Sequence, residues 1–99
     1  AYDAALADFD LLVMPTVPMR ATPLPSADAP AAEVIQRAHE MMTNTAAFTV
    51  TGHPALSMPC ALSDGLPVGM MLVSRRYDEC AIYRAAHAFE AAVEWQTIN

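Results

Sequence analysis

The fold is decided by one stretch, Asn44 to Glu79, which reads NTAAFTVTGHPALSMPCALSDGLPVGMMLVSRRYDE. It is apolar and has a proline or glycine at each corner, which is typical of a buried hairpin. The segment Ser63-Asp64-Gly65 is predicted to be a three-residue hairpin loop, because glycine supplies the positive φ that such a loop requires. The run from Val68 to Val73 is apolar on both faces apart from Gly69, so it is predicted to be the more central strand.

The strand before the loop alternates Leu56, Met58, Cys60 and Leu62 with smaller residues, and Pro59 interrupts it. A proline inside a strand predicts a bulge or an edge position. Cys60 is the most reactive side chain here, and a thiolate beside a histidine is the usual cysteine nucleophile. Because apolar surroundings disfavour the thiolate, Cys60 is interpreted as structural.

The N-terminal part is predicted to be a helix that leads into a buried strand. Tyr2, Leu6 and Phe9 follow helical i, i+4, i+7 spacing, and the continuous apolar run Leu11–Met14 stops at Pro15. Five of the eight prolines then fall between Pro15 and Pro30. Since proline fixes φ and removes a backbone donor, residues 15–30 are predicted to form an ordered but irregular loop.

Three further helices are expected. Asp28 and Pro30 predict the start of a helix that carries Glu33 and Arg37 on its more solvent-exposed face. A short helix from Ala46 to Val50 is predicted to stop at Gly52 and Pro54.

A final helix is predicted to be capped by Asp78. Its stripe of Ile82, Ala86, Phe89 and Val93 is expected to face a core, with Arg84, His87 and Glu94 facing out.

Composition indicates a segment that is buried against something absent from the sequence. The 99 residues make at most one small domain, yet 55% are hydrophobic and only 16% are charged, against roughly 45–50% and 25% for typical soluble domains. Composition and periodicity together predict an α/β segment with a thin core of its own.

The charge excludes some classes of partner. The net charge is −6 and the chain has no lysine, so binding to nucleic acid is not expected. No apolar run is long enough for a membrane span and no signal peptide is visible, so we expect a cytoplasmic protein without membrane contact. The adjacent Arg75 and Arg76 are interpreted as a solvated turn.

The chain offers no recognisable catalytic, metal or cofactor site. His53 precedes Pro54 in a turn, where a hydrogen bond to backbone is expected, and His39 and His87 lie far apart on helices. Neither paired carboxylates nor a phosphate-binding glycine pattern is present. We therefore expect no catalytic residue, no metal and no cofactor in this chain.

A series of short motifs occurs in a fixed order between about Phe9 and Glu90. The motifs are Asp10-Leu11-Leu12, Pro15-Thr16, Asn44, Gly52-His53-Pro54, Pro59, Gly65-Leu66-Pro67-Val68-Gly69, Asp78-Glu79 and Phe89-Glu90. Their order and spacing resemble the C-terminal segment of amidase signature hydrolases. One departure is Ala61, where many members carry glycine.

The resemblance implies amide hydrolysis by a serine nucleophile that a second serine and a lysine activate, with an oxyanion hole of backbone N–H groups. None of these groups is found here, since the chain has no lysine and its four serines lie outside any Gly/Ser-rich loop. The isolated chain is therefore expected to be inactive. The serines are Ser26, Ser57, Ser63 and Ser74.

The resemblance also implies a large mixed sheet covered by helices on both faces, to which residues 1–99 contribute strands and the last helix as an incomplete domain. By this analogy the loop after Met14 reaches the substrate cleft. Asn44 is expected to hydrogen-bond backbone instead of substrate. The candidate substrate-binding residues are Pro15, Thr16, Val17 and Phe48.

Three functions stay open. The first is the C-terminal portion of an amidase acting on small carboxamides, whose partners are the remaining polypeptide or a partner chain, in a homo-oligomer. The second is the corresponding part of a glutamine-dependent tRNA amidotransferase, and the third is a non-catalytic scaffold or binding module. The segment Thr51–Ala55 favours the first. An amidase segment should leave the apolar faces of Leu11–Met14 and Val68–Val73 exposed or paired with another chain.

Overall fold

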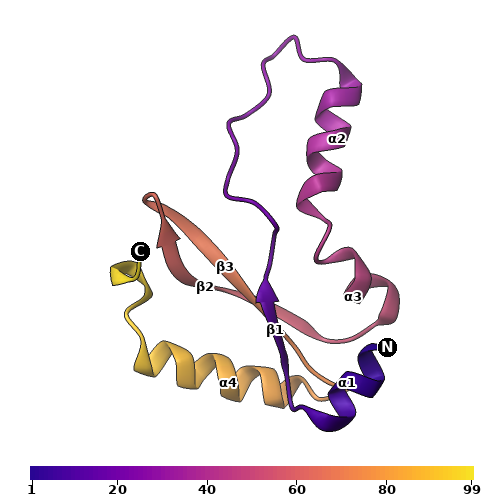
Figure 1. Ribbon diagram of the computed structural model, residues 1–99, viewed down its shortest axis with the longest axis vertical. Coiled ribbons are helices and arrows are strands. Elements are labelled where there is room, and N and C mark those ends of the chain that lie inside the picture. Colours follow the sequence, from indigo (N-terminus) through magenta and orange to yellow (C-terminus); the bar gives the residue numbers. More distant parts are fainter.

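The computed structural model describes residues 1–99 and contains helices and a small sheet (Figure 1). The α/β class is confirmed. In chain order the elements are α1 (Tyr2–Asp8), β1 (Leu12–Pro15), α2 (Ala31–Met41), α3 (Ala46–Thr51), β2 (Ala55–Ser63), β3 (Leu66–Val73), α4 (Glu79–Ala92) and a 3-10 turn, η1 (Trp95–Thr97).

The three strands form an antiparallel sheet in the order β1-β3-β2, so β3 is the central strand, as predicted. Val73 pairs with both Leu12 of β1 and Ala55 of β2. All three strands are antiparallel, so the mixed sheet that the resemblance implies would need further strands.

The predicted three-residue loop is wrong. Ser63 pairs with Leu66 inside the ladder, so only Asp64 and Gly65 form the turn. Both have positive φ, 50° and 77°, and a two-residue turn of this kind needs positive φ at both central positions. Aspartate tolerates that conformation better than most residues, which allows the tighter turn.

The predicted irregularity at Pro59 is confirmed in both of its forms. Pro59 pairs with Gly69 and Ala61 pairs with Val68, so Cys60 is an extra residue in β2. Proline has no N–H to donate, and β2 is an edge strand, where a missing donor costs little. The Cys60 thiol lies 3.5 Å from the Val68 carbonyl oxygen, which agrees with a structural cysteine.

Helices cover both faces of the sheet. On one face α4 packs Ile82 and Ala86 against Met58 and Leu72, and Phe89 extends this cluster. The predicted stripe is confirmed for these three residues, whereas α4 ends at Ala92 and Val93 does not join the cluster. Successive residues of a strand point to opposite faces, so the neighbours of Leu72 face the other way. There Met71 and Val73 form a second cluster with Phe48, joined by side chains from α1 and β1.

The sequence predicts that the apolar face of Val68–Val73 is exposed or paired with another chain. This is wrong for the end of the strand, because the helices of the same chain cover it. Met71, Leu72 and Val73 of β3 are buried within the chain. The outer edge of β1 has no partner strand, and Val13 on it is 59% exposed. The β1 edge and α2 therefore keep exposed apolar side chains, whereas the end of the central strand, from Met71 to Val73, is covered.

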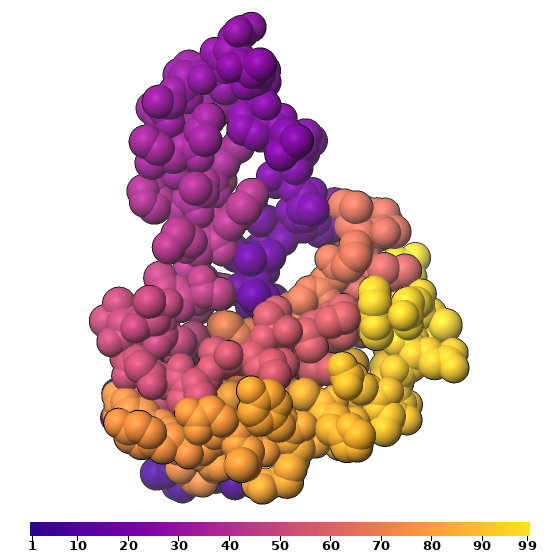
Figure 2. All heavy atoms as spheres, turned by 180° about the vertical axis from the view of Figure 1, so that it is seen from behind, coloured from indigo at the N-terminus to yellow at the C-terminus, as the bar shows by residue number.

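Residues 22–42, which we call the arm, project away from the sheet (Figures 1 and 2). No residue of α2 is buried, and its apolar side chains include half-exposed Val34 and Ile35. The radius of gyration is 15.7 Å, whereas a compact domain of about 100 residues has roughly 13 Å. The chain is therefore more open than an independent domain of its length.

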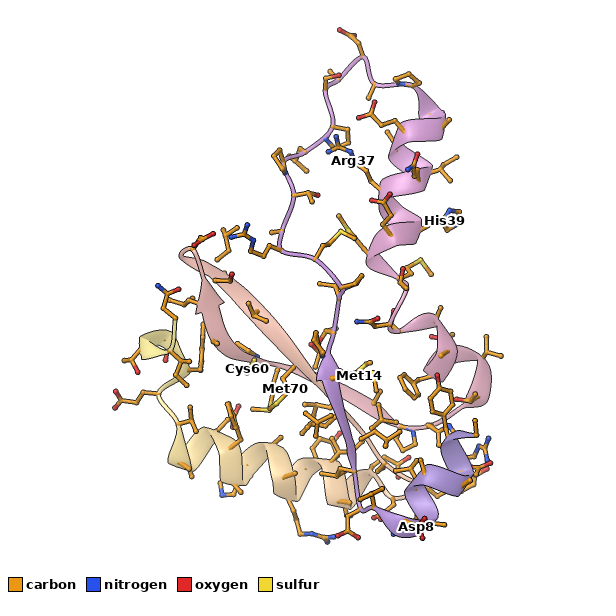
Figure 3. All side chains as sticks on the ribbon, in the orientation of Figure 1. Asp8, Met14, Arg37, His39, Cys60 and Met70 are labelled. Carbon is orange, nitrogen blue, oxygen red and sulfur yellow. The ribbon has the colours of Figure 1, made fainter.

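Within the arm, Arg37 joins α2 to the preceding loop. Its guanidinium donates to Glu33 at 3.0 Å, the predicted i, i+4 pair, and to the Pro23 carbonyl oxygen at 2.8 Å. Figure 3 shows Arg37 pointing toward the loop and His39 pointing away from it. Residues 16–30 are neither helix nor strand.

The helix starts predicted from Asp28 and Asp78 differ in outcome. The Asp28 prediction is wrong because Pro30 occupies the cap position and α2 begins at Ala31, which leaves Asp28 too early in the chain. Asp78 is the N-cap residue of α4, as predicted, although its side chain makes no capping hydrogen bond. α3 ends at Gly52, whose φ of 73° is the left-handed conformation that ends many helices.

Candidate functional site

A cavity of about 260 Å³ lies where β1 ends, between α3 and the sheet. We call it the first cavity. Its wall combines aromatic and aliphatic side chains with hydroxyl groups and one histidine. The lining residues are Thr16, Thr45, Phe48, Thr49, His53, Ala55, Leu56, Ser57 and Met71.

The structure divides the four predicted substrate-binding residues. Thr16 and Phe48 meet in the first cavity, whereas Val17 lines a second cavity of about 370 Å³ beside the hairpin. Pro15 lines neither of the two, and its carbonyl oxygen accepts a hydrogen bond from Asn44 Nδ2 at 2.9 Å. Asn44 therefore binds backbone, as expected. The binding roles of the four residues stay predictions.

The polar part of the first cavity forms where the chain just after β1 lies close to β3. The Thr16 amide donates to the Gly69 carbonyl oxygen at 2.9 Å, and Thr16 Oγ1 lies 2.6 Å from Ser57 Oγ. A Cβ at Gly69 would be 2.9 Å from Thr16 Oγ1 and 3.2 Å from Ser57 Oγ. Only glycine at this position lets the two hydroxyls meet.

The sequence does not single out Ser57 as a site residue. Nothing in its own surroundings marks it, because it is a small residue in the alternation of β2. The available signal is Gly69, since a glycine inside an apolar strand often marks the close approach of another group.

His53 is buried beside the first cavity and is held by two side chains. Its Nε2 lies 2.9 Å from Asp3 Oδ1 and its Nδ1 lies 2.7 Å from Thr51 Oγ1. A carboxylate only accepts, so Nε2 carries a proton and donates it to Asp3, while Nδ1 shares its hydrogen bond with the Thr51 hydroxyl. The expected bond to backbone is wrong, because α1 brings Asp3 to the ring from 50 residues away.

Arg75 and Arg76 are also more than a solvated turn. Arg75 Nε donates to the Leu6 carbonyl oxygen at 2.6 Å, which satisfies an acceptor at the end of α1 that has no partner in its own helix. Arg76 donates to both carboxylate oxygens of Asp3, at 3.0 and 3.1 Å, and to the Thr51 carbonyl oxygen at 3.0 Å. The two arginines fasten α1 against the strand ends.

These contacts predict how stability changes with pH when Asp3 is replaced by asparagine. The hydrogen bond with His53, and then the Arg76 guanidinium, hold the pKa of Asp3 below its ordinary value of 3.8. The stabilisation is therefore fully present above that value and is lost as the pH falls through the lower, folded-state pKa. In urea unfolding, we expect Asp3→Asn to be less stable than the wild type at about pH 7 and to approach it at about pH 2. An equal difference at both pH values would contradict this assignment.

The remaining reactive groups do not form a site. His39 and His87 are exposed, and the histidine nearest the sheet, His53, has Asp3 and Thr51 as partners instead of Cys60. No three His, Cys, Asp or Glu side chains lie close enough together to hold a metal ion. None of the helices has the length and apolar content needed to cross a membrane.

The similarity of this chain to known proteins identifies the family to which it belongs. The family model described as Amidase matches residues 1–83. An "Enantioselective amidase" of Rhodococcus rhodochrous is 50% identical over 93 residues, which is 94% of this chain and 18% of that protein. An "Uncharacterized protein in nthA 5'region" of Rhodococcus erythropolis is 51% identical over 90 residues, 91% of this chain and 45% of that protein.

A glutamyl-tRNA(Gln) amidotransferase component of Exiguobacterium sibiricum is 41% identical over 92 residues, which is 92% of this chain and 18% of that protein. The chain thus spans less than half the length of each of these relatives. Over most of its own length, however, it matches the family model and each relative. The chain belongs to the amidase signature family.

Proposed function

We propose that this chain is the C-terminal part of an amidase that hydrolyses small carboxamides to a carboxylate and ammonia. The observation that carries the proposal is the match of residues 1–83 to the amidase family, together with 50% identity to an enantioselective amidase. The open shape, the unpaired β1 edge and the exposed arm support the same view, since further polypeptide would cover them.

The proposed chemistry is an acyl-enzyme mechanism. A serine attacks the amide carbon, ammonia leaves, and water then hydrolyses the seryl ester. A second serine and a lysine pass the proton from the nucleophile to the departing nitrogen. This chain contains no lysine, so we place the nucleophile and its relay on polypeptide outside residues 1–99.

In this proposal the chain provides support and part of the substrate pocket. The sheet and its two layers of helices hold Pro15, Thr16, Val17 and Phe48 at the end of β1, where substrate would bind. Two free cysteines, Cys60 and Cys80, suit a reducing compartment such as the cytoplasm.

The second candidate function is that of a tRNA amidotransferase component that uses glutamine. It is supported by relatives named as glutamyl-tRNA(Gln) amidotransferases, with 31 to 41% identity. Identity to the enantioselective amidase is higher, at 50%, and this favours the free-standing amidase. A non-catalytic module derived from the fold is the third possibility.

Trapping the acyl-enzyme tests the proposal. The complete protein is incubated with benzamide or isobutyramide, quenched in acid and mapped by peptide mass spectrometry. We expect an acyl group on one serine outside residues 1–99, and hydroxylamine should release it as a hydroxamate.

Three results would overturn the proposal. An acyl group on Ser26, Ser57, Ser63 or Ser74 would place the nucleophile in this chain. Acylation by glutamine but by no simple amide would favour the amidotransferase. Absence of any acylation or ammonia release would favour the non-catalytic module.

A further inference from the structure

The hydroxyl pair of Thr16 and Ser57 has unused hydrogen-bonding capacity. The two oxygens lie 2.6 Å apart, and either one is able to donate to the other. Neither hydroxyl has another hydrogen-bond partner in the chain. Each hydroxyl has one donor and two acceptor lone pairs, so the pair as a unit offers one free O–H donor together with free acceptor sites.

Both hydroxyl-bearing residues line the first cavity, so the free donor and acceptors of the pair are available to a ligand there. The apolar part of that wall includes Phe48, Leu56 and Met71. A ligand that fits would have one compact polar group for the hydroxyls and a hydrocarbon group for the apolar wall.

The cavity also limits the size of the ligand. Its volume is about 260 Å³, whereas an apolar cavity of about 150 Å³ is sufficient for benzene. Sites for drug-sized molecules occupy roughly 300 to 1,000 Å³. A single ring or a short branched alkyl chain fits within this volume.

The lining offers an ionised ligand no free charged partner. Of the residues around the cavity only His53 is ionisable, and both of its ring nitrogens are occupied by Asp3 and Thr51. An ion placed here would lose water without gaining a charged partner, which is costly.

We infer that the Thr16–Ser57 hydroxyl pair binds the carboxamide of an uncharged, single-ring or branched-alkyl amide whose hydrocarbon group fills the first cavity. A carboxamide has one acceptor oxygen and two N–H donors, which complement the free donor and the free acceptors of the pair. A carboxylate only accepts, so the reaction product complements the pair poorly. This inference rests on the proposed function and adds the substrate class and Ser57.

Equilibrium binding to the complete protein tests the inference, with benzamide and benzoate as probes in ligand-observed NMR. We expect the wild type to bind benzamide about tenfold more tightly than benzoate. Loss of one uncharged hydrogen bond typically weakens binding by about two- to tenfold. Thr16→Val and Ser57→Ala should each weaken benzamide binding by that factor and leave benzoate binding nearly unchanged.

Matched variants separate recognition from general damage. Thr16→Ser keeps the hydroxyl and should bind benzamide as the wild type does. Gly69→Ala pushes a methyl group against both hydroxyls and should weaken binding as the deletions do. The controls are Thr43→Val and Ser26→Ala, whose hydroxyls lie outside the cavity and which should bind as the wild type does.

The inference is overturned if benzamide does not bind, if benzoate binds as tightly, or if Thr16→Val and Ser57→Ala retain wild-type affinity. Benzamide affinity is taken from spectra recorded before measurable hydrolysis, so binding and turnover are read separately. A protein that forms an acyl-enzyme but shows unchanged affinity in the variants would keep the proposed function and lose this inference. A protein that binds benzamide through the pair but forms no acyl-enzyme would do the reverse.

Discussion

Replacing Val73 with aspartate is expected to abolish the folded state of this part of the protein. Val73 is 0% exposed and lies in one cluster with Phe48 and Met71. It also pairs with both edge strands, through Leu12 and Ala55. A carboxylate there would be surrounded by the apolar side chains of this cluster. An uncompensated buried charge costs about 3–5 kcal/mol, a large share of the roughly 5–15 kcal/mol that stabilises a typical protein.

Urea unfolding followed by circular dichroism measures this effect, and Val50→Asp is the matched control. Val50 is 86% exposed, and surface substitutions usually change stability by less than about 0.5 kcal/mol. We expect the control to unfold at nearly the wild-type urea concentration. If the two variants unfold at the same concentration, Val73 does not lie in a packed core.

Phe48→Ala is expected to reduce both stability and selectivity. The ring is 4% exposed and packs against Tyr2 at a centroid distance of 4.9 Å and edge-on to His53 at 6.5 Å. Truncating a buried phenylalanine costs about 3–5 kcal/mol. Because the same ring lines the first cavity, KM for benzamide should rise several-fold more than KM for acetamide, which has little hydrocarbon to lose.

Phe9→Ala is the control, since Phe9 is 64% exposed and lies outside the first cavity. Unfolding curves and amide kinetics of the complete protein are compared for the two variants. Equal losses of stability would contradict the packing of Phe48, and an unchanged KM ratio would contradict its contact with substrate.

The parts of the fold that depend on neighbouring residues can be predicted from the sequence. Gly65 marks the hairpin, Pro59 marks the bulge, and the apolar run ending at Val73 marks the central strand, because each effect acts within a few residues. The error in turn length has a similar origin, since two adjacent residues with positive φ replace one.

The long-range contacts cannot be predicted in this way. Asp3 reaches His53 and Arg76 across 50 and 73 residues, and Arg75 reaches Leu6 across 69. No local pattern reveals such pairs, so these charged side chains look like solvated ones in the sequence.

The candidate site shows the same division. The resemblance of the motifs points to Thr16 and Phe48, and the structure brings them to one cavity. Ser57 becomes visible only when the register of β2 against β3, and the position of Thr16 beside Gly69, are known.

The most direct test of the central claim is ammonia release from benzamide by the isolated chain of 99 residues, measured beside the complete protein. Our account predicts release by the complete protein and none by the isolated chain, because the chain has no lysine and the proposed nucleophile lies outside it. Ammonia release by the isolated chain would contradict the account.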